Sequence, residues 1–254
     1  MYVASIVPTR HLHLVADDPY HLVLAQAVGK YKQYTTFYKQ LSDDGKFITL
    51  DNGAAEGECM EIDELYARAF MVNAKEIVLP DEFFEAQQTL DMVDEAYNYL
   101  YDNDWTGNIM AVPQGQDIEE WVRCAVKIVV NYPAVNVIGV PKNLVHLGGW
   151  YGRAKGIARL IEEASYRRRP FHLHLLGCWL DPREVSVIYK IFGNHIRSVD
   201  SRMPYLYAKT DNPLSPKYEK PKGREMDFDD CIIDEGLLED NIRRWRAYAY
   251  GELW

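Results

Sequence analysis

Short apolar runs, each ended by a polar residue, a proline or a glycine, alternate along this chain with longer segments of helical periodicity. The runs fill residues 3–7, 47–50, 76–79, 108–112, 136–140, 171–176 and 196–199. Runs without polar alternation are typical of strands that are buried on both faces of a parallel sheet. The pattern therefore predicts an α/β protein in which parallel strands alternate with helices.

Between these runs, apolar residues recur three and four positions apart, as they do on a helix with one buried face. Tyr20, Leu24, Val28 and Tyr31 follow this spacing and predict one helix over residues 19–41. Further helices are predicted over residues 61–73, 82–101 and 235–248. Two more are predicted to begin at residues 117 and 181, and another to end at residue 168. No eighth strand is evident in the pattern, and a short or irregular one is expected near residues 231–233.

The length of 254 residues and the number of strands favour a TIM-type (β/α)8 barrel with a weak eighth strand. No G-x-G-x-x-G follows the first strand and no G-x-x-x-x-G-K-[ST] occurs, which argues against nucleotide-binding open sheets. No linker divides the chain, so residues 1–254 are predicted to form one domain. Residues 201–227 read as a long basic loop with tyrosines, followed by a C-terminal helix.

The charge and the cysteines narrow the possible partners. A formal net charge of -10 argues against loose, charge-driven coating of nucleic acid. The four cysteines are widely separated and show no zinc spacing, so we expect reduced thiols and no metal.

The N-terminus lacks the basic region of a signal peptide, and no segment is apolar for long enough to cross a membrane. We therefore expect a cytoplasmic protein without membrane contact.

The strand ends carry the candidate chemistry, because active sites of TIM barrels lie at the C-terminal ends of the strands. The residues at these positions are Thr9, Asp51, Asp81, Gln114, Gly139, Gly177 and Asp200. Each of them alone is typical of a cap or a turn. Three carboxylates at one barrel mouth repel each other and cost stability, which indicates that Asp51, Asp81 and Asp200 have a function.

Six motifs at these strand ends resemble those of a known family. They are Leu50-Asp51-Asn52-Gly53, Ile77-Val78-Leu79-Pro80-Asp81-Glu82, Val112-Pro113-Gln114-Gly115, Ile138-Gly139-Val140-Pro141, His174-Leu175-Leu176-Gly177 and Ser198-Val199-Asp200-Ser201. In this order they resemble the tRNA-guanine transglycosylases. They resemble more closely the shorter relatives that put 7-deazaguanine bases into DNA. The resemblance covers residues 6–208.

The resemblance implies a pentosyltransferase that exchanges guanine for a 7-deazaguanine derivative, preQ0-like, in DNA. Asp200 would be the nucleophile that attacks C1′ and forms a covalent glycosyl-enzyme. Asp51 would act as general acid or base on the exchanging base. The base would be held by a substrate-binding set made of Asn52, Asp81, Gln114, Gly115, Gly139 and Val140.

The chain also departs from the tRNA enzymes, which carry a CxCxxC…H zinc site near the C-terminus. Residues 203–254 contain one cysteine, Cys231, and no histidine. The resemblance therefore implies an enzyme without zinc or another cofactor. It implies DNA as the substrate and a free 7-deazaguanine base as the second substrate. The guanosine would be flipped or single-stranded. The basic loop, with Arg202 and Lys209, would bind the DNA strand. Its tyrosines, Tyr205, Tyr207 and Tyr218, would stack on unpaired bases, although a solvated loop explains them equally well.

Three alternatives stay open. The first is the same guanine exchange on tRNA, and the second is a retaining glycoside hydrolase that uses Asp51 and Asp200. The third is a barrel without catalysis that only binds nucleic acid. Among the histidines, His11 and His13 form a pair in a loop without a third ligand, which favours a structural role. His172 and His174 share one face of a strand, which favours hydrogen bonding within the core.

Overall fold

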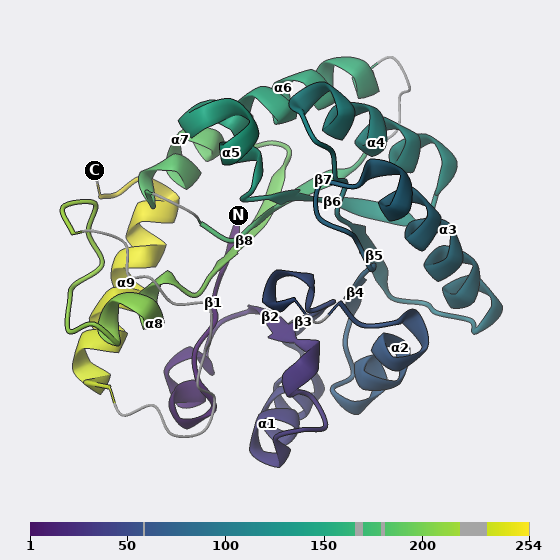
Figure 1. Cartoon of the computed structure of the whole chain (residues 1–254). Helices are drawn as coiled ribbons and strands as arrows, with labels where there is room; N and C mark the ends of the chain where they lie inside the picture. The colour runs from purple at the N-terminus through teal and green to yellow at the C-terminus, as the bar shows by residue number, and fades with distance from the viewer. Residues whose placement is uncertain (58, 166–169, 179–180, 219–232, 254) are drawn as a thin grey trace.

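Eight parallel strands form one sheet in a computed structural model that describes residues 1–254 except 58, 166–169, 179–180, 219–232 and 254. The strands are β1 (Tyr2–Ser5), β2 (Tyr20–Leu24), β3 (Phe47–Asp51), β4 (Glu76–Val78), β5 (Asn108–Ala111), β6 (Val135–Pro141), β7 (His172–Leu176) and β8 (Ile196–Ser201). Their order in the sheet is β1-β8-β7-β6-β5-β4-β3-β2. The two edge strands, β1 and β2, lie next to each other, so the sheet nearly closes into a barrel (Figure 1).

Helices connect the strands and surround the sheet (Figure 1). They are α1 (Lys32–Asp43), α2 (Ile62–Met71), α3 (Ala86–Asp102), α4 (Ile118–Asn131), α5 (Leu144–Gly148), α6 (Gly152–Ser165), α7 (Arg183–Phe192), α8 (Met203–Ala208) and α9 (Glu235–Tyr250). Short 3-10 helices lie at η1 (Thr9–Val15), η2 (Ala25–Ala27), η3 (Ala54–Glu56) and η4 (Gly149–Tyr151). This arrangement confirms the predicted TIM-type barrel. No helix in the described ranges combines the length and the hydropathy that crossing a bilayer requires.

The eighth strand is β2, and the prediction of a helix over residues 19–41 is wrong in its first half. Every residue from Tyr20 to Leu24 is buried, and the strand pairs with β3 in parallel. Because β2 is buried on both faces, it shows no regular alternation of apolar and polar residues, and His21 is its one polar residue. Its apolar residues therefore also fit the spacing of a helix face. The helix α1 begins only at Lys32. Of the strand expected near residues 231–233, residues 231–232 lie outside the described part of the chain.

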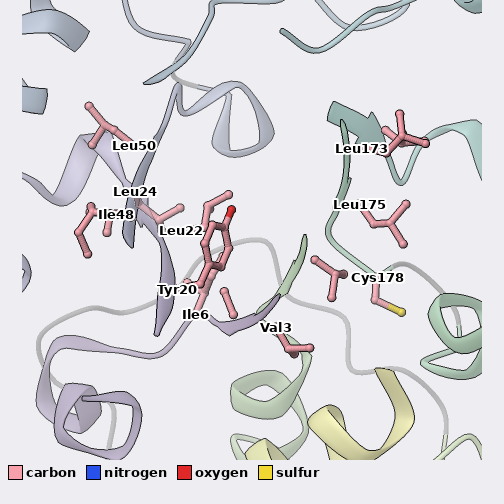
Figure 2. Packing of buried hydrophobic residues seen from close by; sticks show 14 of the residues in the cluster. Val3, Ile6, Tyr20, Leu22, Leu24, Ile48, Leu50, Leu173, Leu175 and Cys178 are labelled. Carbon is pink, nitrogen blue, oxygen red and sulfur yellow. The ribbon is translucent and has the colours of Figure 1, made fainter. Parts of the chain in front are cut away.

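The hydrophobic core occupies both faces of the sheet. In Figure 2, Tyr20 and Leu22 of β2 lie on the side of the sheet that faces the barrel interior, whereas Ile48 and Leu50 of β3 lie on the opposite side. A second, smaller cluster comes from the neighbouring strands β4 to β7 and consists of Val78, Met110, Val112 and Val137, with Leu176 against it.

The inside of the barrel is partly polar. Residues two apart on a strand share a face, so Glu76 lies on the same face of β4 as Val78, and His174 on the same face of β7 as Leu176. Both polar side chains are fully buried. Buried polar groups of this kind require hydrogen-bonding partners, and both side chains find theirs on β8.

The C-terminal helix α9 completes the helical layer beside β1. Its Trp245 is fully buried and donates a hydrogen bond from Nε1 to the Ala4 carbonyl at 3.1 Å. The prediction of a loop over residues 201–227 is wrong at its start, because α8 forms there and packs against α9. Residues 219–227 lie outside the described part of the chain. Asn241 of α9 donates to the Pro204 carbonyl at 3.2 Å, which ties the two helices together.

Candidate functional site

The polar residues predicted at the strand ends lie at one end of the barrel. Asp51 is the last residue of β3, Asp200 lies next to the end of β8, and Asp81 and Gln114 follow β4 and β5. All four are buried, with between 1% and 8% of their surface exposed. Because the strands are parallel, their C-terminal ends share one edge of the sheet, and these side chains therefore gather at the mouth of the barrel.

Asp81 is held by two amide side chains. Its Oδ1 accepts a hydrogen bond from Asn52 Nδ2 and its Oδ2 accepts one from Gln114 Nε2, both at 2.6 Å. The orientation of each amide is set by a second contact. Asn52 Oδ1 accepts from the Ala54 amide at 2.9 Å, and Gln114 Oε1 accepts from Asn143 Nδ2 at 3.2 Å. The trio is therefore a preorganised polar cradle in which both oxygens of Asp81 face donors.

The pKa of Asp81 is raised to about 6, and burial is the main cause. The hydrogen bonds from Asn52 and Gln114 act in the opposite direction and lower the pKa, while the nearby Glu82 raises it. Desolvation is the larger effect because the carboxyl group is almost completely removed from water.

Asp81 is expected to make the protein less stable as the pH rises from about 4 to about 6. The unfolded chain loses this proton near pH 4, whereas the folded protein keeps it up to about pH 6, so the folded state binds more protons in between. The free energy of unfolding should therefore fall across this window by roughly 3 kcal/mol and then level off. Urea unfolding at several pH values measures it. The decline should be much smaller in Asp81→Asn and unchanged in the exposed control Asp104→Asn, and a decline that persists in Asp81→Asn would contradict this origin.

Asp200 forms the second polar centre. Its Oδ1 accepts hydrogen bonds from His174 Nε2 and from the Gly177 amide, both at 3.0 Å. Gly177 has a φ of 64°, a left-handed conformation that favours glycine and that turns the chain just after β7. His174 is fully buried, and its Nδ1 lies 2.7 Å from Ser198 Oγ. The carboxylate is therefore fixed on one oxygen by two neighbours.

His174 is the residue of this site that sequence reasoning missed. It was predicted to form core hydrogen bonds, which it does, but its partner is the carboxylate at the barrel mouth. The link depends on the register of β7 with β8, in which His174 pairs with Ser198. Residues two apart share a face, so Ser198 and Asp200 both point toward His174. Only the register brings these three side chains together.

A buried ion pair in the helical layer supports the turn at Gly177. Arg153 of α6 donates from Nε and Nη2 to the two carboxylate oxygens of Glu184 of α7, at 2.9 and 2.7 Å. Arg153 Nη1 also donates to the Gly177 carbonyl at 2.8 Å. Since the amide of the same residue contacts Asp200, this ion pair helps to position the carboxylate.

Three of the predicted substrate contacts have structural explanations. Gly139 and Val140 lie inside β6, where they pair with His174 and Leu175 of β7 rather than ending the strand. A Cβ on Gly139 would come within 2.8 Å of Leu176 Cδ1, and Val140 is fully buried. Gly115 packs against the first turn of α4. The structure therefore brings Asn52, Asp81 and Gln114 together at the mouth, whereas the two residues of β6 are part of the sheet.

Replacing Gly115 by alanine is expected to destabilise the protein by about 1–3 kcal/mol. The added Cβ would lie 2.5 Å from the Trp121 amide nitrogen, so backbone and not a flexible side chain must move. The free energy of unfolding in urea measures the effect. Gly236→Ala in α9 is the matched control and should be close to neutral, because its Cβ would meet nothing closer than 3.3 Å. Equal stability of the two variants would mean that α4 shifts without cost.

The predicted DNA-binding segment is largely packed in the fold. Tyr205 and Tyr207 are buried, with 0% and 1% exposure, so the prediction that they stack on unpaired bases is wrong. Arg202 precedes α8 and is half-buried, while Lys209 is exposed and its Nζ lies 5.8 Å from the centre of the Tyr205 ring. Tyr218 is exposed. The other basic residues of this segment after residue 218 lie outside the described residues.

Within the described ranges, no group of three or more histidine, cysteine, aspartate or glutamate side chains is placed to hold a metal ion. The expectation of a protein without metal or cofactor stays a prediction.

Comparisons with known proteins support the fold. No protein-family model matches the chain, and no curated protein matches it. Among solved structures, the YdjI aldolase from Escherichia coli K12 is similar, with a TM-score of 0.58, 11% identity, and coverage of 98% of this chain and 88% of that one. A variant of methylaspartate ammonia lyase from Clostridium tetanomorphum matches with a TM-score of 0.51 and 14% identity, over 99% of this chain and 59% of that one. A monomeric dihydrodipicolinate synthase variant matches with a TM-score of 0.50 and 10% identity, over 80% and 69%.

These comparisons overturn the predicted DNA transglycosylase. These three solved structures are an aldolase, a lyase and a synthase, and none of the three is a tRNA-guanine transglycosylase. The correction extends to guanine exchange on tRNA and to the glycoside hydrolase. The resemblance of the strand-end motifs to the transglycosylase family stays a prediction, because no family model matches. At such low identity the similarity shows the fold alone, so a function has to be argued from the site.

Proposed function

We propose that this protein is an aldolase-like enzyme of the lyase class that breaks a carbon–carbon bond beside a carbonyl group at the barrel mouth. The observation that carries the proposal is the hydrogen bonding and the accessibility of the Asp200 carboxylate. Its Oδ1 is held by His174 and Gly177, whereas its Oδ2 has no hydrogen-bond partner in the described part of the chain. The side chain is 8% exposed, so the carboxylate is fixed but still accessible. A positioned carboxylate of this kind suits general base catalysis.

Lys142 supplies a positive charge on the same side of the mouth. It directly follows β6 and is half-buried. Its Nζ lies 3.8 Å from the position that a Cβ on Gly177 would occupy, and the Gly177 amide contacts Asp200. An ammonium group and a carboxylate therefore flank one turn. In the proposed reaction, the carbonyl compound would bind between this proton acceptor and this cation.

The proposed reaction begins at the hydroxyl group of a β-hydroxy carbonyl substrate. Asp200 takes the hydroxyl proton, the carbon–carbon bond breaks, and its electron pair moves toward the carbonyl to form an enolate. The Lys142 ammonium stabilises the negative charge on the enolate oxygen, and the enolate carbon then takes the proton from Asp200, which becomes a carboxylate again. The hydroxyl-bearing fragment leaves as an aldehyde or ketone. Each bond that breaks is matched by one that forms.

The remaining polar groups favour a substrate rich in hydrogen-bond donors. Asp51 and Asp81 add two carboxyl groups to the mouth that already contains Asp200. Anionic groups in excess would be repelled, whereas hydroxyl or amino groups would find acceptors. We therefore expect hydroxylated or aminated carbonyl compounds rather than polyphosphates.

The test is a direct assay for bond cleavage. The purified protein is incubated with a panel of β-hydroxy carbonyl compounds, including hydroxylated 2-oxo acids, and proton NMR follows the appearance of two smaller carbonyl products. In deuterated water, the product that arises from the enolate should carry deuterium. Cleavage of at least one compound, with its loss in Asp200→Asn, supports the proposal. No cleavage across the panel, or cleavage that survives in Asp200→Asn, would overturn it.

A further inference from the structure

A continuous chain of buried and partly buried polar contacts runs through the barrel from β4 to Asp200. It begins at Glu76, which is fully buried and forms a bidentate ion pair with Arg197 of β8, whose Nη2 lies 2.8 Å from Glu76 Oε1. Arg197 Nε donates to Ser198 Oγ at 3.1 Å. Ser198 Oγ lies 2.7 Å from His174 Nδ1, and His174 Nε2 lies 3.0 Å from Asp200 Oδ1. Four consecutive contacts therefore connect Glu76 to the carboxylate that the proposed function uses.

Chemistry fixes the donor at the first contact, and the donors at the next two contacts are assigned from it. An arginine guanidinium can only donate hydrogen bonds, so Ser198 Oγ is the acceptor toward Arg197. The hydroxyl of Ser198 still carries its own proton, and His174 Nδ1 lies at 2.7 Å as an acceptor for it. When Nδ1 accepts, the neutral imidazole carries its proton on Nε2. That proton then points at Asp200 Oδ1.

A second hydroxyl group reinforces the same direction. The Tyr20 hydroxyl lies 3.4 Å from His174 Nδ1. Burial raises the pKa of Tyr20, so the phenol keeps its proton and remains a donor. Two donors therefore face Nδ1, and protonation of this nitrogen would remove the acceptor that both of them share.

We propose that Arg197 and Ser198 are positioning residues that hold His174 in its Nε2–H tautomer and thereby keep Asp200 as the hydrogen-bonded carboxylate. Glu76 is needed because it balances the charge of Arg197 inside the barrel. The opposite tautomer would direct the imidazole proton to Ser198 and would require a proton on Asp200 to fill the Nε2 contact. A protonated Asp200 could not act as a base. The inference rests on the proposed function only for the role of Asp200, since the tautomer is a property of the protein without substrate.

The test is nitrogen-15 NMR of the protein labelled at its seven histidines, without any substrate. His174 is assigned by its absence in His174→Gln. In the wild type, Nδ1 should have the shift of an unprotonated nitrogen and Nε2 that of a protonated one. Ser198→Ala should raise the fraction of the Nδ1–H tautomer about tenfold, which corresponds to about 1.4 kcal/mol, the size of one hydrogen bond. Ser5→Ala, a buried serine on the neighbouring β1 with no partner for its hydroxyl among the described residues, is the control and should leave the spectrum of His174 unchanged.

Arg197→Lys separates the role of the arginine from that of the serine. It keeps a positive charge for Glu76 but removes the Nε–H that fills one lone pair of Ser198. The tautomer ratio should move in the same direction as in Ser198→Ala. A protonated Nδ1 in the wild type, or an unchanged ratio in either variant, would overturn the proposal. This measurement needs no substrate, so a negative cleavage assay would overturn the proposed function without affecting the assignment of the tautomer. Likewise, the opposite tautomer would overturn this inference without affecting the result of the cleavage assay.

Discussion

Asp200→Asn is expected to lower the rate of bond cleavage by a factor of about 10²–10⁴, the range by which a positioned general base accelerates a reaction. The asparagine keeps the size of the side chain, and its oxygen can still accept from His174 and from the Gly177 amide. Its amide nitrogen then occupies the position of Oδ2 and cannot take a proton. The fold should therefore remain while the reaction stops.

Steady-state kinetics on the substrate found in the cleavage assay measure this loss. The effect should be on kcat, with little change in KM, because the base acts on the transition state more than on binding. Asp211→Asn is the matched control. Asp211 is exposed and has a φ of 54°, a conformation that asparagine tolerates, so full activity is expected. A rate within a few-fold of wild type in Asp200→Asn would exclude Asp200 as the base.

Arg153→Met is expected to give the largest loss of stability, about 3–5 kcal/mol. Arg153 is fully buried, and Glu184 is 3% exposed. Without the guanidinium, the carboxylate of Glu184 stays in the interior with no opposite charge, and the Gly177 carbonyl loses its donor. The free energy of unfolding in urea measures the loss.

The double variant Arg153→Met/Glu184→Leu separates the cost of an unpaired charge from the value of the pair. Removing both charges should recover a large part of the stability, because two apolar side chains of similar volume can replace a buried ion pair. Arg159→Met is the control, since Arg159 pairs with glutamates at the surface and should contribute between zero and about 1 kcal/mol. If the double variant were no more stable than Arg153→Met, the unpaired charge would not be the cause.

The turn at Gly177 links stability to the site. Its carbonyl is held by the buried ion pair from the helical layer, and its amide is held by Asp200 at the barrel mouth. The network that extends from Glu76 reaches the same carboxylate from inside the barrel. Asp200 is therefore supported from two directions, as a reactive group has to be when its geometry decides the rate.

The prediction of a DNA transglycosylase was wrong, and the reason lies in what strand-end motifs can specify. Short motifs such as Leu50-Asp51-Asn52-Gly53 combine a buried strand with a polar residue and a glycine turn. Many parallel barrels need this combination wherever a strand ends and the chain turns into the next helix. Their order along the chain therefore predicted the fold and the end of the barrel that carries the polar groups. It did not specify the chemistry, because the same fold supports many reactions.

The amino-acid pattern was sufficient for the alternation of strands and helices, and for the gathering of Asp51, Asp81, Gln114 and Asp200 at one mouth. Both follow from local rules, since burial sets the apolar runs and parallel strands end on one side. It was not sufficient for β2, because a strand that is buried on both faces and has one polar residue, His21, shows apolar spacing that also fits a helix face. Nor did it reveal the contact of His174 with Asp200. That contact depends on the register between two strands, which is set by packing over the whole barrel and not by residues that are neighbours in the chain.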